Sequence, residues 1–95
     1  MEYASRLFAI RGEPKSINSN IVVPGITITD AWERLAKSRS QDADNLISAL
    51  ADQIAPMGPM RAHHVSVAVA FLCSEHGKWI TGLSVPVDGG VHLKI

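Results

Sequence analysis

The sequence lacks several features that specialised classes of protein require. It contains one cysteine, Cys73, so no internal disulfide can form, and a reducing, cytoplasmic location is the expectation. Its longest apolar run, Val65–Cys73, is interrupted by Ser66 and falls well short of the roughly 20 residues that span a bilayer. The N-terminus shows no basic segment followed by an apolar core, so we expect no signal peptide.

Net charge is also absent. Nine Lys and Arg residues balance nine Asp and Glu residues. A binder of nucleic acid or of a lipid surface needs a net basic face, so neither partner class is expected. The 95 residues suit one small domain, and 46% hydrophobic against 19% charged residues is typical of a chain that folds.

Known catalytic and phosphate-binding patterns are missing as well. The seven glycines form no G-x-G-x-x-G series and no P-loop. Ser84 follows Gly82 as in a nucleophile elbow, but it falls within a predicted strand and not at a strand-to-helix turn. The four histidines have no metal-ligand spacing with Cys73, which we expect to be a small buried apolar residue. His63 and His64 predict a solvated helix start.

The first part of the chain predicts a helix followed by a strand. Leu7, Phe8 and Ile10 indicate the end of an amphipathic helix, which Gly12 and Pro14 would stop.

Residues 17–23 predict a strand. Its second half, Ile21–Val23, is apolar and β-branched throughout, as in a parallel strand covered on both faces. Pro24–Gly25 would end this strand.

Three helices are predicted next. Thr29 or Asp30 can cap a short helix, and Asp30 has the spacing of a capping box with Glu33. A second helix has an apolar stripe, which consists of Ala43, Leu46, Ile47, Leu50, Ala51 and Ile54. The third, about Ala62–Ser74, is apolar nearly all round and needs cover on several sides, with Gly77 suited to its C-terminal cap.

A second strand, Leu83–Val87, follows. Two strands joined through helices predict one parallel crossover, the unit of an α/β sheet. Trp32 and Trp79 are expected to be packing residues, and Asp88 is expected to form a turn with Gly89–Gly90 more readily than to bind a ligand.

The segment Pro24–Thr29 is the most promising ligand site. It lies just past the carboxyl end of a parallel strand, where ligands bind in open α/β sheets. An ordinary strand-to-helix connection would have the same pattern, so both interpretations stand at this point.

Three groups of residues resemble short-chain dehydrogenases/reductases. Asn20–Gly25 with Thr29 resembles the segment after the family's catalytic helix. Val69–Ser74, Trp79–Gly82 and Val87–Gly90 resemble the family's C-terminal region in order and spacing. The resemblance runs from about Ser5 to His92 and implies the C-terminal part of a Rossmann-like, doubly wound parallel sheet.

The resemblance also implies a function. The family moves a hydride between NAD or NADP and an alcohol or ketone, and the residues after Pro24 and Gly25 would receive the nicotinamide carboxamide. That role would fall to the backbone of Thr27 and the hydroxyl of Thr29. Residues 30–60 would be the variable substrate lid. The last strand and the helix before it would form an oligomer contact.

The family's catalytic parts have no counterpart in these 95 residues. The glycine-rich cofactor motif, the Asn-Ala-Gly segment, the catalytic serine and the Tyr-x-x-x-Lys pair would all precede Met1. Tyr3 does not replace the tyrosine, because Leu7 stands where the lysine is required. The family's usual acidic residue at the helix start is replaced by His63 and His64.

The sequence therefore predicts one partial domain, residues 1–95, that is inactive alone as an oxidoreductase. NAD or NADP would be the family's cofactor, not bound by this chain by itself. The alternatives are an interaction module that associates with itself or with a full-length relative, and one half of a split enzyme completed by an N-terminal partner chain.

Overall fold

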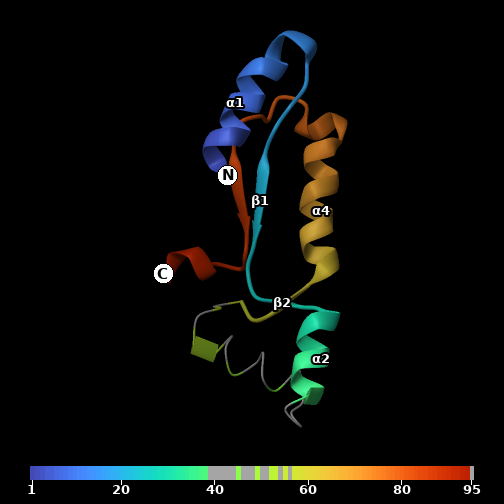
Figure 1. Ribbon diagram of the computed structural model, residues 1–95, viewed down its shortest axis with the longest axis vertical. Coiled ribbons are helices and arrows are strands. Elements are labelled where there is room, and N and C mark those ends of the chain that lie inside the picture. The colour runs from blue at the N-terminus through green and yellow to red at the C-terminus, as the bar shows by residue number, and fades with distance from the viewer. Residues whose placement is uncertain (39–44, 46–48, 50–51, 54, 56, 95) are drawn as a thin grey trace.

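The computed structural model describes residues 1–95 except 39–44, 46–48, 50–51, 54, 56 and 95. Its centre is a pair of parallel strands, β1 (Ile21–Pro24) and β4 (Ser84–Val87), in the register Ile21 with Ser84 to Pro24 with Val87. The two strands run side by side along the molecule (Figure 1). The predicted parallel α/β crossover is confirmed.

β1 begins four residues later than the sequence predicted, because the polar residues before it use their side chains to reach the neighbouring segment. The Asn18 side chain donates to the Lys78 carbonyl at 2.8 Å. The Asn20 side chain donates to the Ile80 carbonyl at 2.9 Å and accepts from the Leu83 N–H at 3.1 Å. These bonds replace a regular ladder and set the register of the two strands that follow.

The other end of β1 agrees with the prediction to within one residue. The strand was expected to stop at Val23 before Pro24–Gly25, and Pro24 is its last residue and pairs with Val87. A strand end tolerates proline because few ladder bonds remain to be made there.

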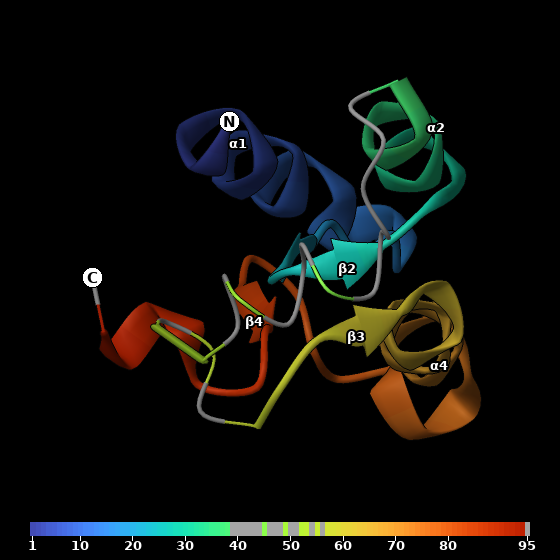
Figure 2. The same cartoon turned by 90° about the horizontal axis from the view of Figure 1, so that it is seen from below.

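Helices cover the two sides of the strand pair. α1 (Glu2–Gly12) and α4 (Ala62–Cys73) lie on opposite sides of it (Figure 2). Both helices were predicted, but the prediction of which α1 residues face the interior is wrong. Ser5, Ala9 and Gly12 are buried, whereas the larger Leu7, Phe8 and Ile10 are exposed. The Ser5 hydroxyl lies 3.1 Å from that of Ser19, just before β1. A Cβ on Gly12 would lie 2.4 Å from the Ile17 carbonyl oxygen, so glycine allows the tight turn that leaves the helix.

A second, shorter parallel ladder joins β2 (Thr27–Ile28) to β3 (Met60–Arg61). The Met60 N–H donates to the Ile26 carbonyl at 2.8 Å beside it. α2 (Asp30–Ser38) follows β2 directly, so the residue before the helix is Thr29 and not Asp30. The predicted helical stripe between Ala43 and Ile54 lies outside the described residues.

Three 3-10 turns complete the described elements: η1 (Glu13–Lys15), η2 (Glu75–Gly77) and η3 (Val91–Leu93). α4 ends at Cys73 with Ser74 at its C-cap, so the expectation that Gly77 caps this helix is wrong. Gly77 serves a different purpose. A Cβ there would lie 2.5 Å from the Leu72 carbonyl oxygen, so only glycine fits without displacing the end of α4.

The described residues bury few apolar side chains, and the molecule is elongated, at 53 × 25 × 23 Å. Its radius of gyration is 16.3 Å, against about 12 Å for a compact chain of this length. Its accessible surface is 6990 Å², against about 5300 Å² for a compact protein of this mass. The excess surface indicates that apolar faces of the helices and strands remain accessible to solvent.

The predictions that Cys73 and Trp79 are packing residues fail for this reason, whereas Trp32 is half-buried. Cys73 is exposed, and Trp79 is 92% exposed. No residue of α4 is buried, although its mean composition is strongly apolar. Ile21 and Val22 are half-buried and Val23 is exposed, so β1 is not covered on both faces within this chain.

Candidate functional site

The candidate site lies where β1 and β4 end together at their carboxyl ends. Parallel strands bring these ends to one edge, and the loop Pro24–Thr29 leaves β1 at this edge. The Gly25 N–H donates to the Val87 carbonyl at 3.1 Å, which extends the ladder by one bond. The loop therefore starts from a fixed point on β4.

Gly25 is required by its close approach to Asp88. A Cβ on Gly25 would lie 2.7 Å from both the Cα and the Cβ of Asp88. Real Cβ atoms do not approach backbone so closely, so a larger residue would push the two strand ends apart. The Pro-Gly pair at positions 24 and 25 thus brings the loop against the turn that follows β4.

The two threonines of the loop lie on either side of Ile28. The Thr27 hydroxyl donates to the Gly25 carbonyl at 3.1 Å, which holds the turn in shape. Thr29 is exposed, and its carbonyl accepts from the Glu33 N–H at 3.1 Å in the first turn of α2. A hydroxyl has one donor and two acceptor positions, so both threonines retain polar capacity toward a ligand.

An open hollow of about 590 Å³ lies between this loop and α4. Its lining is mostly apolar with three hydroxyl side chains, and it consists of Pro24, Thr27, Thr29, Ala62, Val65, Ser66, Val69 and Ala70. The structure thus brings three of the four expected site residues, Pro24, Thr27 and Thr29, to one surface. Gly25 lies behind it, against Asp88.

Asp88 forms the turn that the sequence predicted and is 8% exposed. Its Oδ1 accepts from the Gly90 N–H at 2.9 Å, and its Oδ2 accepts from the His92 N–H at 3.0 Å. Nδ1 of His92 lies 3.0 Å from both carboxyl oxygens. Gly89 and Gly90 take the positive φ values of 60° and 92° that this tight turn needs.

The pKa of the Asp88 carboxyl reflects two opposed effects. Burial would raise its pKa, because it penalises the charged form. The hydrogen bonds from the His92 side chain and from the backbone of Gly90 and His92 favour the carboxylate and prevail, so the pKa lies below its ordinary value. Asp88 is a structural carboxylate at neutral pH.

Sequence reasoning missed two parts of this region. The ladder between β2 and β3 has two residues per strand, too short for any periodicity to indicate it. The bond between Asp88 and His92 had a usable signal, since a histidine four residues after an aspartate across Gly89–Gly90 can close on it. The expected solvated start of α4 is confirmed: His63 and His64 are exposed, and His64 Nδ1 accepts from the Arg61 N–H at 2.8 Å.

Among the described residues that line the hollow, the polar side chains are hydroxyl groups, and none is a carboxyl, imidazole or amino group. Tyr3 lies exposed on α1, and Leu7 follows it one turn later. Among the described residues, no group of His, Cys, Asp and Glu could hold a metal ion. None of the helices in the described part of the chain has the length and apolar character needed to cross a membrane.

Comparisons with known proteins agree with this geometry. A family model described as enoyl-(acyl carrier protein) reductase matches residues 1–92. Tetrahydroxynaphthalene reductase from Pyricularia oryzae is 30% identical over 96 residues, which cover 95% of this chain and 34% of the relative. The 3-oxoacyl-(acyl-carrier-protein) reductase FabG from Pseudomonas aeruginosa is 31% identical over 94 residues, which cover 98% of this chain and 35% of the relative.

Solved structures agree in fold. L-sorbose reductase from Gluconobacter frateurii, solved with NADPH and L-sorbose, superposes with a TM-score of 0.83 at 26% identity. The match covers 95% of this chain and 36% of that one. The chain spans about a third of the length of the relatives that it matches. With a family match over residues 1–92 and a Rossmann-type fold, the chain belongs to the short-chain dehydrogenases/reductases.

Proposed function

We propose that these residues form the nicotinamide end of an NAD(P)-dependent oxidoreductase, with Pro24, Gly25, Thr27 and Thr29 as the cofactor-binding loop. The observation that carries the proposal is the shared hollow, which has Pro24, Thr27 and Thr29 on one wall and α4 on the other. Bound NAD or NADP would supply the hydride-transfer chemistry. The residues of this chain would hold and orient one end of it.

The chemistry of the loop fits a carboxamide. An amide needs one donor for its oxygen and one acceptor for its NH₂ group, both at fixed positions. The backbone at Thr27 and the hydroxyl at Thr29 can supply these, and the apolar wall of Val65, Val69 and Ala70 suits the face of a ring. The ladder between β2 and β3 limits how far the loop can move.

We propose further that the chain by itself has no turnover. Reduction of a ketone needs an acid to protonate the developing alkoxide. The hollow of the described residues carries only hydroxyl groups of serine and threonine, which are weak acids. A site that binds one end of a dinucleotide through a few polar contacts also forms a weak complex.

The experiment combines the chain with the part of Pseudomonas aeruginosa FabG that it does not match, and follows NADPH oxidation with a 3-oxoacyl substrate. The chain alone should not oxidise NADPH, and the mixture should gain an activity that Thr29→Ala removes. Ser38→Ala is the matched control, because it removes an exposed hydroxyl at the far end of α2. Turnover by the chain alone, or turnover in the mixture that ignores Thr27→Ala and Thr29→Ala, would refute the proposal.

An interaction module is the second candidate, and a specific observation favours it. Val67 is 66% exposed and Phe71 is 50% exposed one turn apart on α4. Such a surface, together with the excess accessible area, suits a second copy of this chain or an N-terminal partner chain. The two candidates are compatible, since a split oxidoreductase requires association. We propose residues 1–95 as one partial domain that works in the cytoplasm, which the single cysteine supports.

A further inference from the structure

We infer that Asp88 is a positioning residue that fixes the candidate nicotinamide loop through the turn after β4. The inference rests on the proposed function for what the loop binds. The positioning of the loop by Asp88 is a property of this chain and holds whatever the loop binds. The physical question is how a loop at the free end of β1 keeps Thr27 and Thr29 in one place.

The Asp88 carboxylate organises the turn from within. Its two oxygens accept the N–H groups of Gly90 and His92, and the His92 ring closes over the same oxygens. The Asp88 carbonyl also accepts from the Val91 N–H at 3.2 Å. One residue thus satisfies four donors and holds η3 against the end of β4.

This turn contacts the loop at two places. The backbone of Asp88 lies directly against Gly25, where a Cβ could not fit. Val91, buried at the start of η3, packs with Ala55, and Ile26 of the loop packs against that pair. Gly25 and Ile26 therefore contact Asp88 and Val91, the first and fourth residues of the turn that the Asp88 carboxylate holds in shape.

The position of Thr27 follows from these contacts. Its hydroxyl donates to the carbonyl of Gly25, the residue that Asp88 supports. A movement of the turn after β4 would shift Gly25 and Ile26, and with them both the hydroxyl and the backbone of Thr27. Asp88 does not line the hollow itself, and donors occupy both of its oxygens, so it acts through the loop and not on a ligand.

Hydrogen-deuterium exchange of the full chain tests this inference. Detection by mass spectrometry allows the measurement even if the chain associates. The variants are Asp88→Ala, Asp88→Asn and His92→Gln, with Glu75→Gln as the control, an exposed acid on η2. In Asp88→Ala, the amides of residues 25–28 should exchange about tenfold faster or more, because the buried turn loses its acceptors. Asp88→Asn keeps one acceptor oxygen and should rescue part of the protection.

Local and global effects are separated within the same spectra. Amides of α1 and α4 should keep their exchange rates in Asp88→Ala. Equal acceleration in α1 and α4, or unchanged exchange at residues 25–28, would overturn the inference. If Asp88→Ala does not fold, the comparison uses Asp88→Asn and His92→Gln. No nucleotide enters the experiment. Failure of the mixture with the FabG part to gain activity would therefore count against the proposed function and leave the positioning role intact.

Discussion

Replacing the two outward-facing apolar residues of α4 tests whether this chain depends on association. Val67 and Phe71 lie four residues apart on one face of the helix and leave 66% and 50% of their surface exposed. We consider the double variant Val67→Gln with Phe71→Gln. Glutamine is a good helix former, so the change removes apolar surface and keeps the helical propensity of α4.

The magnitude follows from the exposed fractions. Full burial of a large apolar side chain contributes roughly 1.5–3 kcal/mol, so covering the exposed parts of these two contributes roughly 2–3 kcal/mol per chain. A contact in which two copies cover each other would lose this amount twice. The dissociation constant should then rise about a thousandfold or more.

Sedimentation velocity over a concentration series measures the effect directly. The wild-type chain should sediment as an associated species or a mixture, with dye binding to exposed apolar surface, and the double variant should shift toward monomer. Tyr3→Gln is the matched control, because Tyr3 is 85% exposed on α1, across the strand pair from α4. A wild-type chain that is one monomeric species with one cooperative melting transition and little dye binding would refute the reasoning.

Three further predictions concern the loop and its support. The chain alone should show no NAD(P)-dependent hydride transfer in an absorbance assay at 340 nm, and transfer that Thr29→Ala abolishes would contradict this expectation. Gly25→Ala should lower the free energy of unfolding by roughly 1–3 kcal/mol in a urea titration, because its Cβ would meet the Asp88 backbone at 2.7 Å. The Asp88 carboxyl has a lowered pKa in the folded chain, so its contribution to stability is present above the ordinary aspartate value of roughly 3.9 and is lost as the pH falls below it. The difference in urea midpoint between wild type and Asp88→Asn should therefore be constant near neutral pH and shrink in acid, and a difference that persists unchanged to about pH 2 would contradict the assignment.

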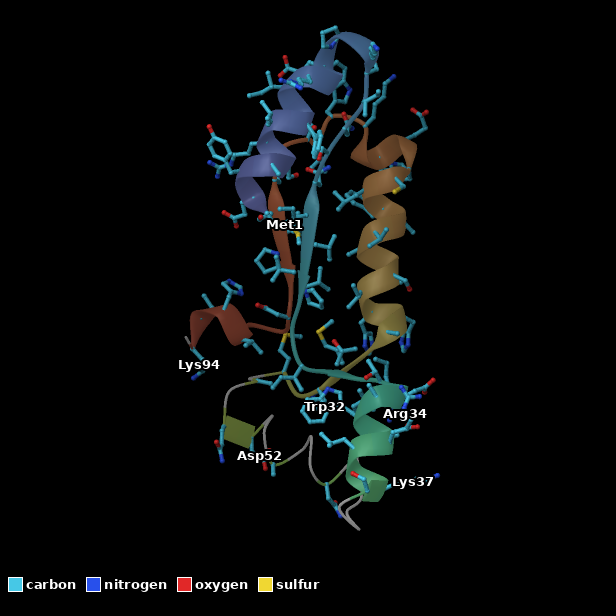
Figure 3. The ribbon with its side chains drawn as sticks, viewed as in Figure 1. Met1, Trp32, Arg34, Lys37, Asp52 and Lys94 are labelled. Carbon is cyan, nitrogen blue, oxygen red and sulfur yellow. The ribbon has the colours of Figure 1, made fainter. Side chains whose placement is uncertain are left out.

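α2 and the ladder between β2 and β3 show how little the sequence says about the arrangement of this part of the chain. Trp32 points from the first turn of α2 to one side of the helix, whereas Arg34 and Lys37 point to the opposite side (Figure 3). The capping-box spacing of Asp30 and Glu33 predicted this short helix, and the helix is confirmed at Asp30–Ser38. The two-residue ladder that ties both ends of this region together depends on residues more than 30 positions apart, and no local pattern indicates it.

Local chemistry by itself determined β1, α4, the final turn and the place of the loop. The β-branched run before Pro24, the apolar run after Arg61 and the glycines after Asp88 predicted β1, α4 and the final turn, because propensity and turn geometry act over a few residues. The same residues carried the resemblance to the family, and the position of Pro24 and Gly25 after a parallel strand indicated the candidate site.

Burial and support were decided only by the tertiary structure. The apolar character of Cys73 and Trp79 predicted burial, yet both are exposed, since burial depends on whether another layer covers a face and not on the residue itself. The contact of Gly25 with Asp88 joins two strand ends that lie 63 positions apart in sequence. A hydroxyl such as that of Thr27 is brought to a usable position by long-range packing, which no short segment of sequence specifies.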